Sequence, residues 1–262
     1  MTLMLTIALG LGAGAHGALY GAYKDSPHES FRARRFAREI VIAVALALAL
    51  GCFYPGTAQQ TAFVLYLSLF ALTRIVTEFW KLFVRVEPQD DFRIPTQIHC
   101  VTGVVRQPAL RLLLGLCFLA SIYGIWALCT LIPSGVPAPL RGVLVGLAIG
   151  SAEALAGAYK DGTIEGFHWF KFFKSPTFGA IGGLVASEHT ADLAFLLLAS
   201  IGTMRMFLEL LFKMLPRDYA PGKFPWSMVG RYTQWAERRR HFILPYAMTW
   251  LLYLVLCSHR GW

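Results

Sequence analysis

Long apolar runs alternate with shorter polar segments along the whole chain. A membrane-spanning helix needs about 20 apolar residues, and by that measure the pattern predicts spans at residues 3–23, 39–54, 60–84, 110–132, 139–159, 176–188, 190–214 and 241–258. The second and sixth of these are the shortest. The pattern therefore predicts an all-α integral membrane protein with about eight transmembrane helices.

One segment occurs twice, each time where an apolar run gives way to polar residues. The sequence Gly-Ala-Tyr-Lys-Asp at 21–25 returns unchanged at 157–161. Further along, an arginine followed four positions later by a glutamate at 74–78 returns at 205–209. The match extends through most of each half of the chain and indicates an internal duplication.

The duplication and the number of spans together predict the architecture. Each half contains four predicted spans, and an even number gives both copies the same orientation in the membrane. We therefore predict two parallel four-helix repeats, at residues 1–136 and 137–262. All copies of the repeated motifs then lie on one side of the membrane.

Composition and charge agree with a membrane protein and suggest its orientation. Hydrophobic residues make up 56% of the chain and charged residues only 15%, which lies outside the usual range of soluble domains. The net charge is +9, and twenty of the 24 lysines and arginines lie around the loops after the first, third, fifth and seventh spans. Positive residues mark the cytoplasmic side. We expect a cell inner membrane protein with both termini on the non-cytoplasmic side and no nucleic-acid partner.

Charged residues inside two predicted spans are the first candidates for a site. Arg74 lies about 10 residues, or roughly 15 Å, from the cytoplasmic end of its span, and Glu78 shares its helix face and can pair with it. Arg205 and Glu209 repeat the arrangement. Because ionisable groups at that depth are costly, a function is the default interpretation. The alternative is a structural ion pair joining the third and seventh spans.

Pairs of carboxylates outside the helix ends form a second candidate set. Each copy has two acidic residues four positions apart next to a lysine: Asp25 and Glu29 beside Lys24, and Asp161 and Glu165 beside Lys160. Carboxylates with this spacing can share a divalent cation with a phosphate, the usual way of holding magnesium. A helix-capping or loop-bracing role is the alternative. Mg²⁺ is therefore a possible cofactor.

The start of the short sixth span has features of an anion site. Ser175 before Pro176 fits an N-cap followed by the first helical residue, and a helix N-terminus beside Lys174 attracts phosphate. The alternative is close helix packing through the glycines that follow, at 179, 182 and 183. Aromatic and basic residues at 167–173 predict a segment in the membrane interface.

One candidate pair breaks the internal symmetry. Glu153 interrupts the fifth span, whereas the matching position of the first copy is Gly17, next to His16. Because an active site on a duplicated scaffold can diverge between copies, Glu153 and His16 are candidates for handling protons or selecting a substrate. The alternative is that a neighbouring helix satisfies each of them.

These candidates suggest three kinds of function. Common catalytic and nucleotide-binding signatures such as GxSxG, HExxH and the Walker loop are absent from the sequence. We expect a charged pocket that faces the cytoplasm and binds and transports an anionic amphiphile, such as a polyprenyl phosphate or a phospholipid. The alternatives are a metal-dependent transferase or phosphatase acting on a lipid phosphate, and a non-catalytic membrane subunit of a larger complex. The expected partners are membrane lipids and a phosphate-bearing substrate.

Overall fold

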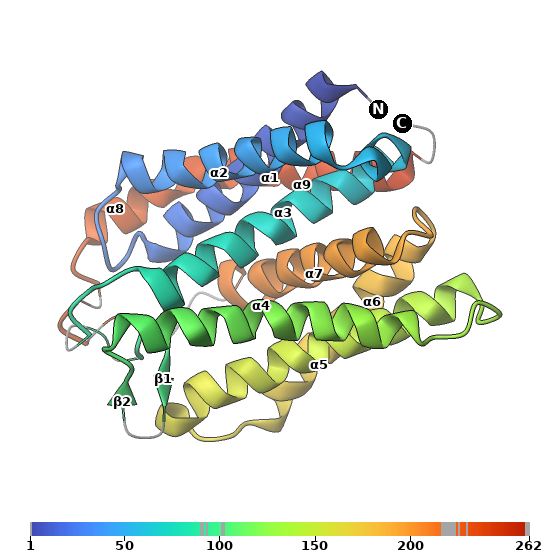
Figure 1. Cartoon of the computed structure of the whole chain (residues 1–262). Coiled ribbons are helices and arrows are strands. Elements are labelled where there is room, and N and C mark those ends of the chain that lie inside the picture. Colours follow the sequence, from blue (N-terminus) through green and yellow to red (C-terminus); the bar gives the residue numbers. More distant parts are fainter. Residues whose placement is uncertain are drawn as a thin grey trace.

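The computed structural model describes residues 2–89, 92, 94–100, 103–215, 224, 226–228 and 230–259, except the side chains of 161, 163–165, 226, 235, 236 and 239. Within it, eight long helices run back and forth along one bundle (Figure 1): α1 (Leu3–Asp25), α2 (Ala33–Phe53), α3 (Ala62–Phe79), α4 (Pro108–Thr130), α5 (Ala138–Glu165), α6 (Trp169–Ser187), α7 (Leu193–Glu209) and α9 (Ile243–Ser258). Shorter elements join them: η1 (Pro55–Gln59), η2 (Trp80–Val84), β1 (His99–Cys100), β2 (Gly103–Val104), η3 (Leu210–Met214), η4 (Trp226–Met228), α8 (Thr233–Arg238) and η5 (Arg239–Phe242).

Seven of the described helices are long and apolar enough to cross a membrane, which confirms an all-α, multi-pass membrane protein. The remaining long helix, α6, carries Lys171 and Lys174 in its first turns. It has 19 residues, or about 28 Å. It runs antiparallel to α5, since Gly142 packs on Gly183 and Gly146 on Gly179. Figure 1 shows α6 returning alongside α5.

Two expectations about the second and sixth spans are wrong. Neither helix is short, because α2 begins at Ala33 and α6 at Trp169. Counting apolar residues misses the first turns of such helices, whose charged side chains lie beyond the hydrocarbon. Ser175 is not an N-cap, because His168 holds that position and Pro176 lies inside the helix. The anion site expected at Ser175 is therefore absent.

Close packing through glycine takes the place of that site. A Cβ built on Gly150 of α5 would overlap the backbone of Ser175 and Pro176, and one built on Gly182 of α6 would lie 2.9 Å from the carbonyl oxygen of Ser200 in α7. Small residues let membrane helices approach until their backbones touch. The glycines thus hold α6 between α5 and α7.

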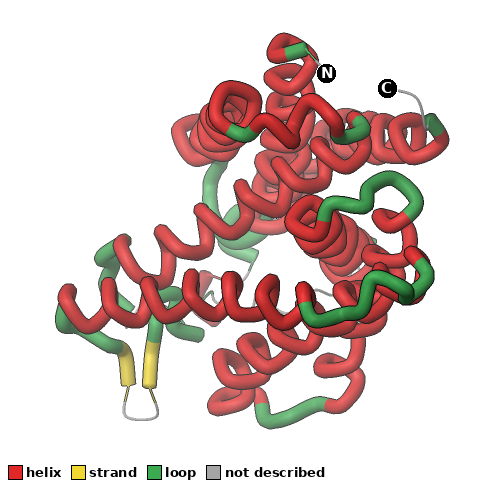
Figure 2. Tube along the Cα trace, turned by 45° about the vertical axis from the view of Figure 1, so that its right-hand side comes forward, coloured by secondary structure: helices red, strands yellow, loops and turns green. Residues whose placement is uncertain are grey.

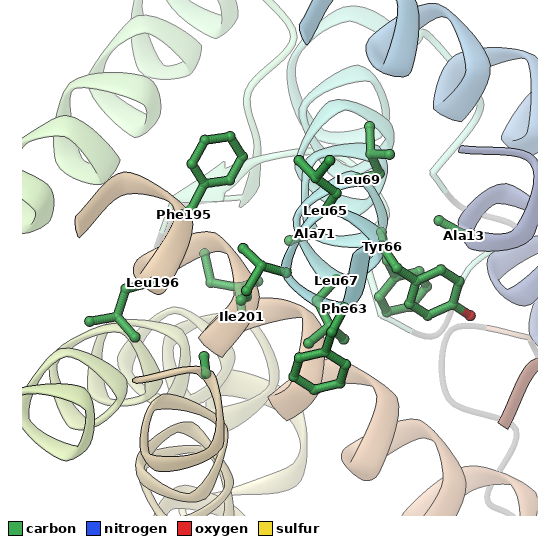
Figure 3. Close-up of a cluster of buried hydrophobic side chains, with 14 of the residues drawn as sticks. Ala13, Phe63, Leu65, Tyr66, Leu67, Leu69, Ala71, Phe195, Leu196 and Ile201 are labelled. Carbon is green, nitrogen blue, oxygen red and sulfur yellow. The ribbon is translucent and has the colours of Figure 1, made fainter. Parts of the chain in front are cut away.

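The core of the bundle is built around α3. Residues 63–67 and 69–71 are apolar and fully buried, as expected of a helix surrounded on every side. Figure 3 shows Ile201 of α7 beside these side chains and Ala13 of α1 facing Tyr66, and Phe195 and Leu196 of α7 belong to the same buried cluster. The crossing is close, since a Cβ on Gly202 would overlap the backbone of Leu67. This packing fixes α3 against α7.

Two of the long helices, α3 and α7, end in a π-helical segment at the same end of the bundle. These are η2 after α3 and η3 after α7. Arg111 of α4 is 2% exposed and donates to the carbonyls of Leu82 and Arg85 at the end of η2. The guanidinium therefore satisfies carbonyls that the helix end leaves without an intrahelical donor.

A short antiparallel hairpin, β1–β2, projects beside the start of α4 (Figure 2). Its His99 accepts a hydrogen bond at its carbonyl from the Tyr159 hydroxyl, 2.8 Å away, and the two rings stack at 5.7 Å. The hairpin therefore touches the end of α5.

Candidate functional site

A cavity of about 430 Å³ opens at one end of the bundle. This end, here termed the cavity end, is where α1, α3, α5 and α7 finish and α2, α4, α6 and α9 begin, and Figure 1 shows both termini at the opposite end. Among the described residues, ten basic and four acidic side chains line the cavity: Lys24, Arg32, Arg35, Arg38, Arg74, Lys81, Arg85, Lys160, Lys171 and Lys213, with Asp25, Glu29, Glu39 and Glu78. The site is therefore strongly positive.

Small residues of α1 form one wall of the cavity. Gly17, Ala18 and Gly21 all line it, and nothing lies within 4 Å of a Cβ built on Gly21. Tyr20 borders the same space, with the Lys24 ammonium 5.5 Å and the Arg74 guanidinium 5.8 Å from its ring centre. The aromatic ring thus holds two cations at the cavity.

Arg74 pairs with a different glutamate from the one expected. Its guanidinium lies 3.0 Å from Glu209 of α7, whereas Glu78 pairs with Lys81 at 3.0 Å. The spacing of Arg74 and Glu78 puts both on one face of α3, but that face turns towards α7, which offers a buried carboxylate. Of the two interpretations, the ion pair between the third and seventh spans is present.

The Arg74–Glu209 pair is also positioned to take a ligand. The side chains are only 13% and 5% exposed, so the charges hold each other deep in the bundle. Arg74 nevertheless lines the cavity. A guanidinium has five N–H donors, and the contact with Glu209 is made through Nη2, which leaves donors for an anion that enters the cavity.

The carboxylates of the first copy lie at the cavity and are bound by Arg35. Its guanidinium contacts Glu29 and lies 3.9 Å from Asp25, and Lys24 lies 3.3 Å from Asp25. The side chains of Asp161 and Glu165 lie outside the described residues.

The first copy thus offers a metal only two carboxylates, Asp25 and Glu29, and Arg35 already pairs with both. No group of three or more His, Cys, Asp or Glu side chains in the described part of the chain could hold a metal ion.

The remaining candidates have separate partners. Glu153 pairs with Arg205 at 3.1 Å, and His16 Nδ1 lies 2.8 Å from the Thr249 hydroxyl. Glu153 and His16 are therefore not a pair, and Arg205 is not paired with the glutamate one turn further along its own helix. Lys174 lies over the Phe212 ring at 4.9 Å and is not among the residues that line the cavity.

Several residues at the cavity were not recognised from the sequence. Arg35, Arg38 and Glu39 lie on one face of the first turns of α2, with Arg38 3.6 Å from Glu39. Their spacing would have revealed this face, but the predicted span began at Glu39 and left out the two arginines. Burial lowers the pKa of Arg85, and Glu87 at 2.9 Å opposes the shift.

The arrangement can bind an anion. Lysines and arginines from both halves of the chain meet around one cavity, and arginine is suited to bidentate contact with phosphate or carboxylate. No protein-family model matches this chain, and no curated protein or solved structure matches it.

Proposed function

We propose that the cavity binds the phosphate-bearing headgroup of an anionic amphiphile, such as a polyprenyl phosphate or a phospholipid, and that the protein carries this molecule across the membrane. The observation that supports this proposal is the excess of basic over acidic side chains around a cavity in a bundle of membrane-spanning helices. Arg74 extends the positive charge about 15 Å inward from the end of its span at Val84.

The cavity end faces the cytoplasm in this proposal, and both termini lie on the other side of a cell inner membrane. The distribution of lysine and arginine supports this orientation. The repeats 1–136 and 137–262 remain part of the proposal, with eight spans in all. They are supported by the π-helical segments after α3 and α7 and by the meeting of Lys24 and Lys160 at one cavity.

The orientation can be tested by cysteine labelling in intact cells, in a variant without the native cysteines. A cysteine at Ser134, in the exposed turn between α4 and α5, is expected to react with an impermeant maleimide from outside. A cysteine at Ser30, beside the cavity, is expected to react only after the cells are opened. The reverse pattern would place the cavity on the outside.

Lipid binding can be measured with the purified protein and a fluorescent phosphatidic acid. We expect binding that survives EDTA, because Arg35 and Lys24 already neutralise the carboxylates of the first copy. Arg74→Ala, Lys24→Ala or Lys160→Ala is expected to weaken binding by about tenfold, the loss of one charge-assisted hydrogen bond. Arg106→Ala is the matched control, since this exposed arginine is not among the residues that line the cavity.

A different result would favour the enzyme. If chelation abolished binding, magnesium restored it, and Asp25→Asn or Asp161→Asn prevented the restoration, the metal-dependent transferase or phosphatase would replace the transporter.

Transport itself is measured in proteoliposomes, where the fluorescent lipid of the inner leaflet should become accessible to dithionite faster than in vesicles without protein.

A further inference from the structure

The second intramembrane ion pair is unusually exposed. Arg205 lies 12 residues after the start of the span Leu193–Met214 and nine before its end, which puts it near mid-membrane. The side chains of Arg205 and Glu153 are 32% and 22% exposed, against 13% and 5% for Arg74 and Glu209. Uncovered charge at this depth is costly, so a polar group is expected to meet this pair.

The helix face that carries Glu153 leads to the cavity. Glu153, Gly157 and Lys160 follow one another at i, i+4 and i+7 on α5 and so share a face. Lys160 lines the cavity. A Cβ built on Gly157 would meet nothing within 4 Å. An open strip of α5 therefore connects the cavity to the Glu153–Arg205 pair.

The same arrangement occurs on α1, where it forms the cavity wall. Gly17, Gly21 and Lys24 repeat the i, i+4, i+7 spacing and all line the cavity, and Gly21 also borders open space. On α1 this face borders the same cavity as Arg74. The α5 face has a glutamate in place of Gly17, and this glutamate binds Arg205.

Both intramembrane arginines can be related to the cavity. Arg74 lines it, and Glu153, the partner of Arg205, shares a face of α5 with Lys160, which also lines it. Glu153 contacts Arg205 through the Nε atom, and a guanidinium has five N–H donors in all.

We infer that Arg205, Glu153 and the open face at Gly157 form a second binding station for the same phosphate-bearing headgroup, midway across the membrane. This inference rests on the proposed function, since the headgroup would arrive from the cavity. The partial exposure of the pair at mid-membrane selects an amphiphile, whose tail remains in hydrocarbon, over free phosphate. No covalent step is involved.

A glycine substitution tests the station without removing a charge. Gly157→Leu fills the open face, and we expect it to slow the flipping of fluorescent phosphatidic acid in proteoliposomes by about tenfold or more, as the loss of one charge-assisted contact would. Binding to the purified protein should stay within about twofold, since Gly157 does not line the cavity. Gly124→Leu on α4 is the matched control, because its Cβ would also meet nothing within 4 Å.

A second variant removes the charges together. Arg205→Gln with Glu153→Gln leaves no lone ion in the membrane, so it should fold while flipping slowly. Flipping at the wild-type rate in both the Gly157→Leu and the double variant would overturn the second station. Failure of the wild type to bind phosphatidic acid at all would instead overturn the proposed function.

Discussion

Arg74→Leu is expected to destabilise the protein by about 3–5 kcal/mol, the usual cost of removing one partner of a buried ion pair. The variant leaves Glu209, which is 4% exposed, as an uncompensated carboxylate in the centre of the bundle. Thermal unfolding in detergent, followed by tryptophan fluorescence or size-exclusion, measures the loss.

Two double variants identify the ion-pair partner of Arg74. Arg74→Leu with Glu209→Leu removes both charges and should recover most of the stability, because replacing a buried pair with apolar residues is often close to neutral. Arg74→Leu with Glu78→Leu should recover little, since Glu78 pairs with Lys81. Recovery by the second variant in place of the first would contradict the observed pairing.

The recovered double variant also separates stability from function. If Arg74→Leu with Glu209→Leu folds normally but no longer binds phosphatidic acid, then Arg74 contacts the ligand. Full binding by this variant would show that the pair is only structural.

Gly146→Leu is expected to have an effect of similar size, about 3 kcal/mol, the upper part of the usual range for overpacking. A Cβ at Gly146 would overlap the carbonyl of Gly179, and neither backbone can move away without separating α5 from α6. The same unfolding measurement applies, together with the yield of monodisperse protein.

A matched substitution controls for the general effect of glycine replacement. Gly124→Leu is also on a membrane helix, but its Cβ would meet nothing within 4 Å, so we expect little change or slight stabilisation from the better helix former. Equal stability of the two variants would mean that α5 and α6 do not pack as closely as described.

The sequence determined the helical membrane class and the end of the bundle at which the basic residues gather. An apolar run of about 20 residues satisfies its own backbone hydrogen bonds in lipid by forming a helix, so the existence of the helices could be predicted from the sequence. The residues at which α2 and α6 begin could not be predicted, because their first turns carry charged residues that are typical of a loop. Arg35 and Arg38 were missed for this reason.

Tertiary structure alone decided which charges meet. A spacing of four residues places Arg74 and Glu78 on one face of α3, but it says nothing about which helix that face contacts. The packing of α3 on α7 brings Glu209 to Arg74, and the packing of α5 on α7 brings Glu153 to Arg205. Ion pairing deep in a membrane protein depends on the nearest buried partner, and that neighbour is set by helix packing, not by distance along the chain.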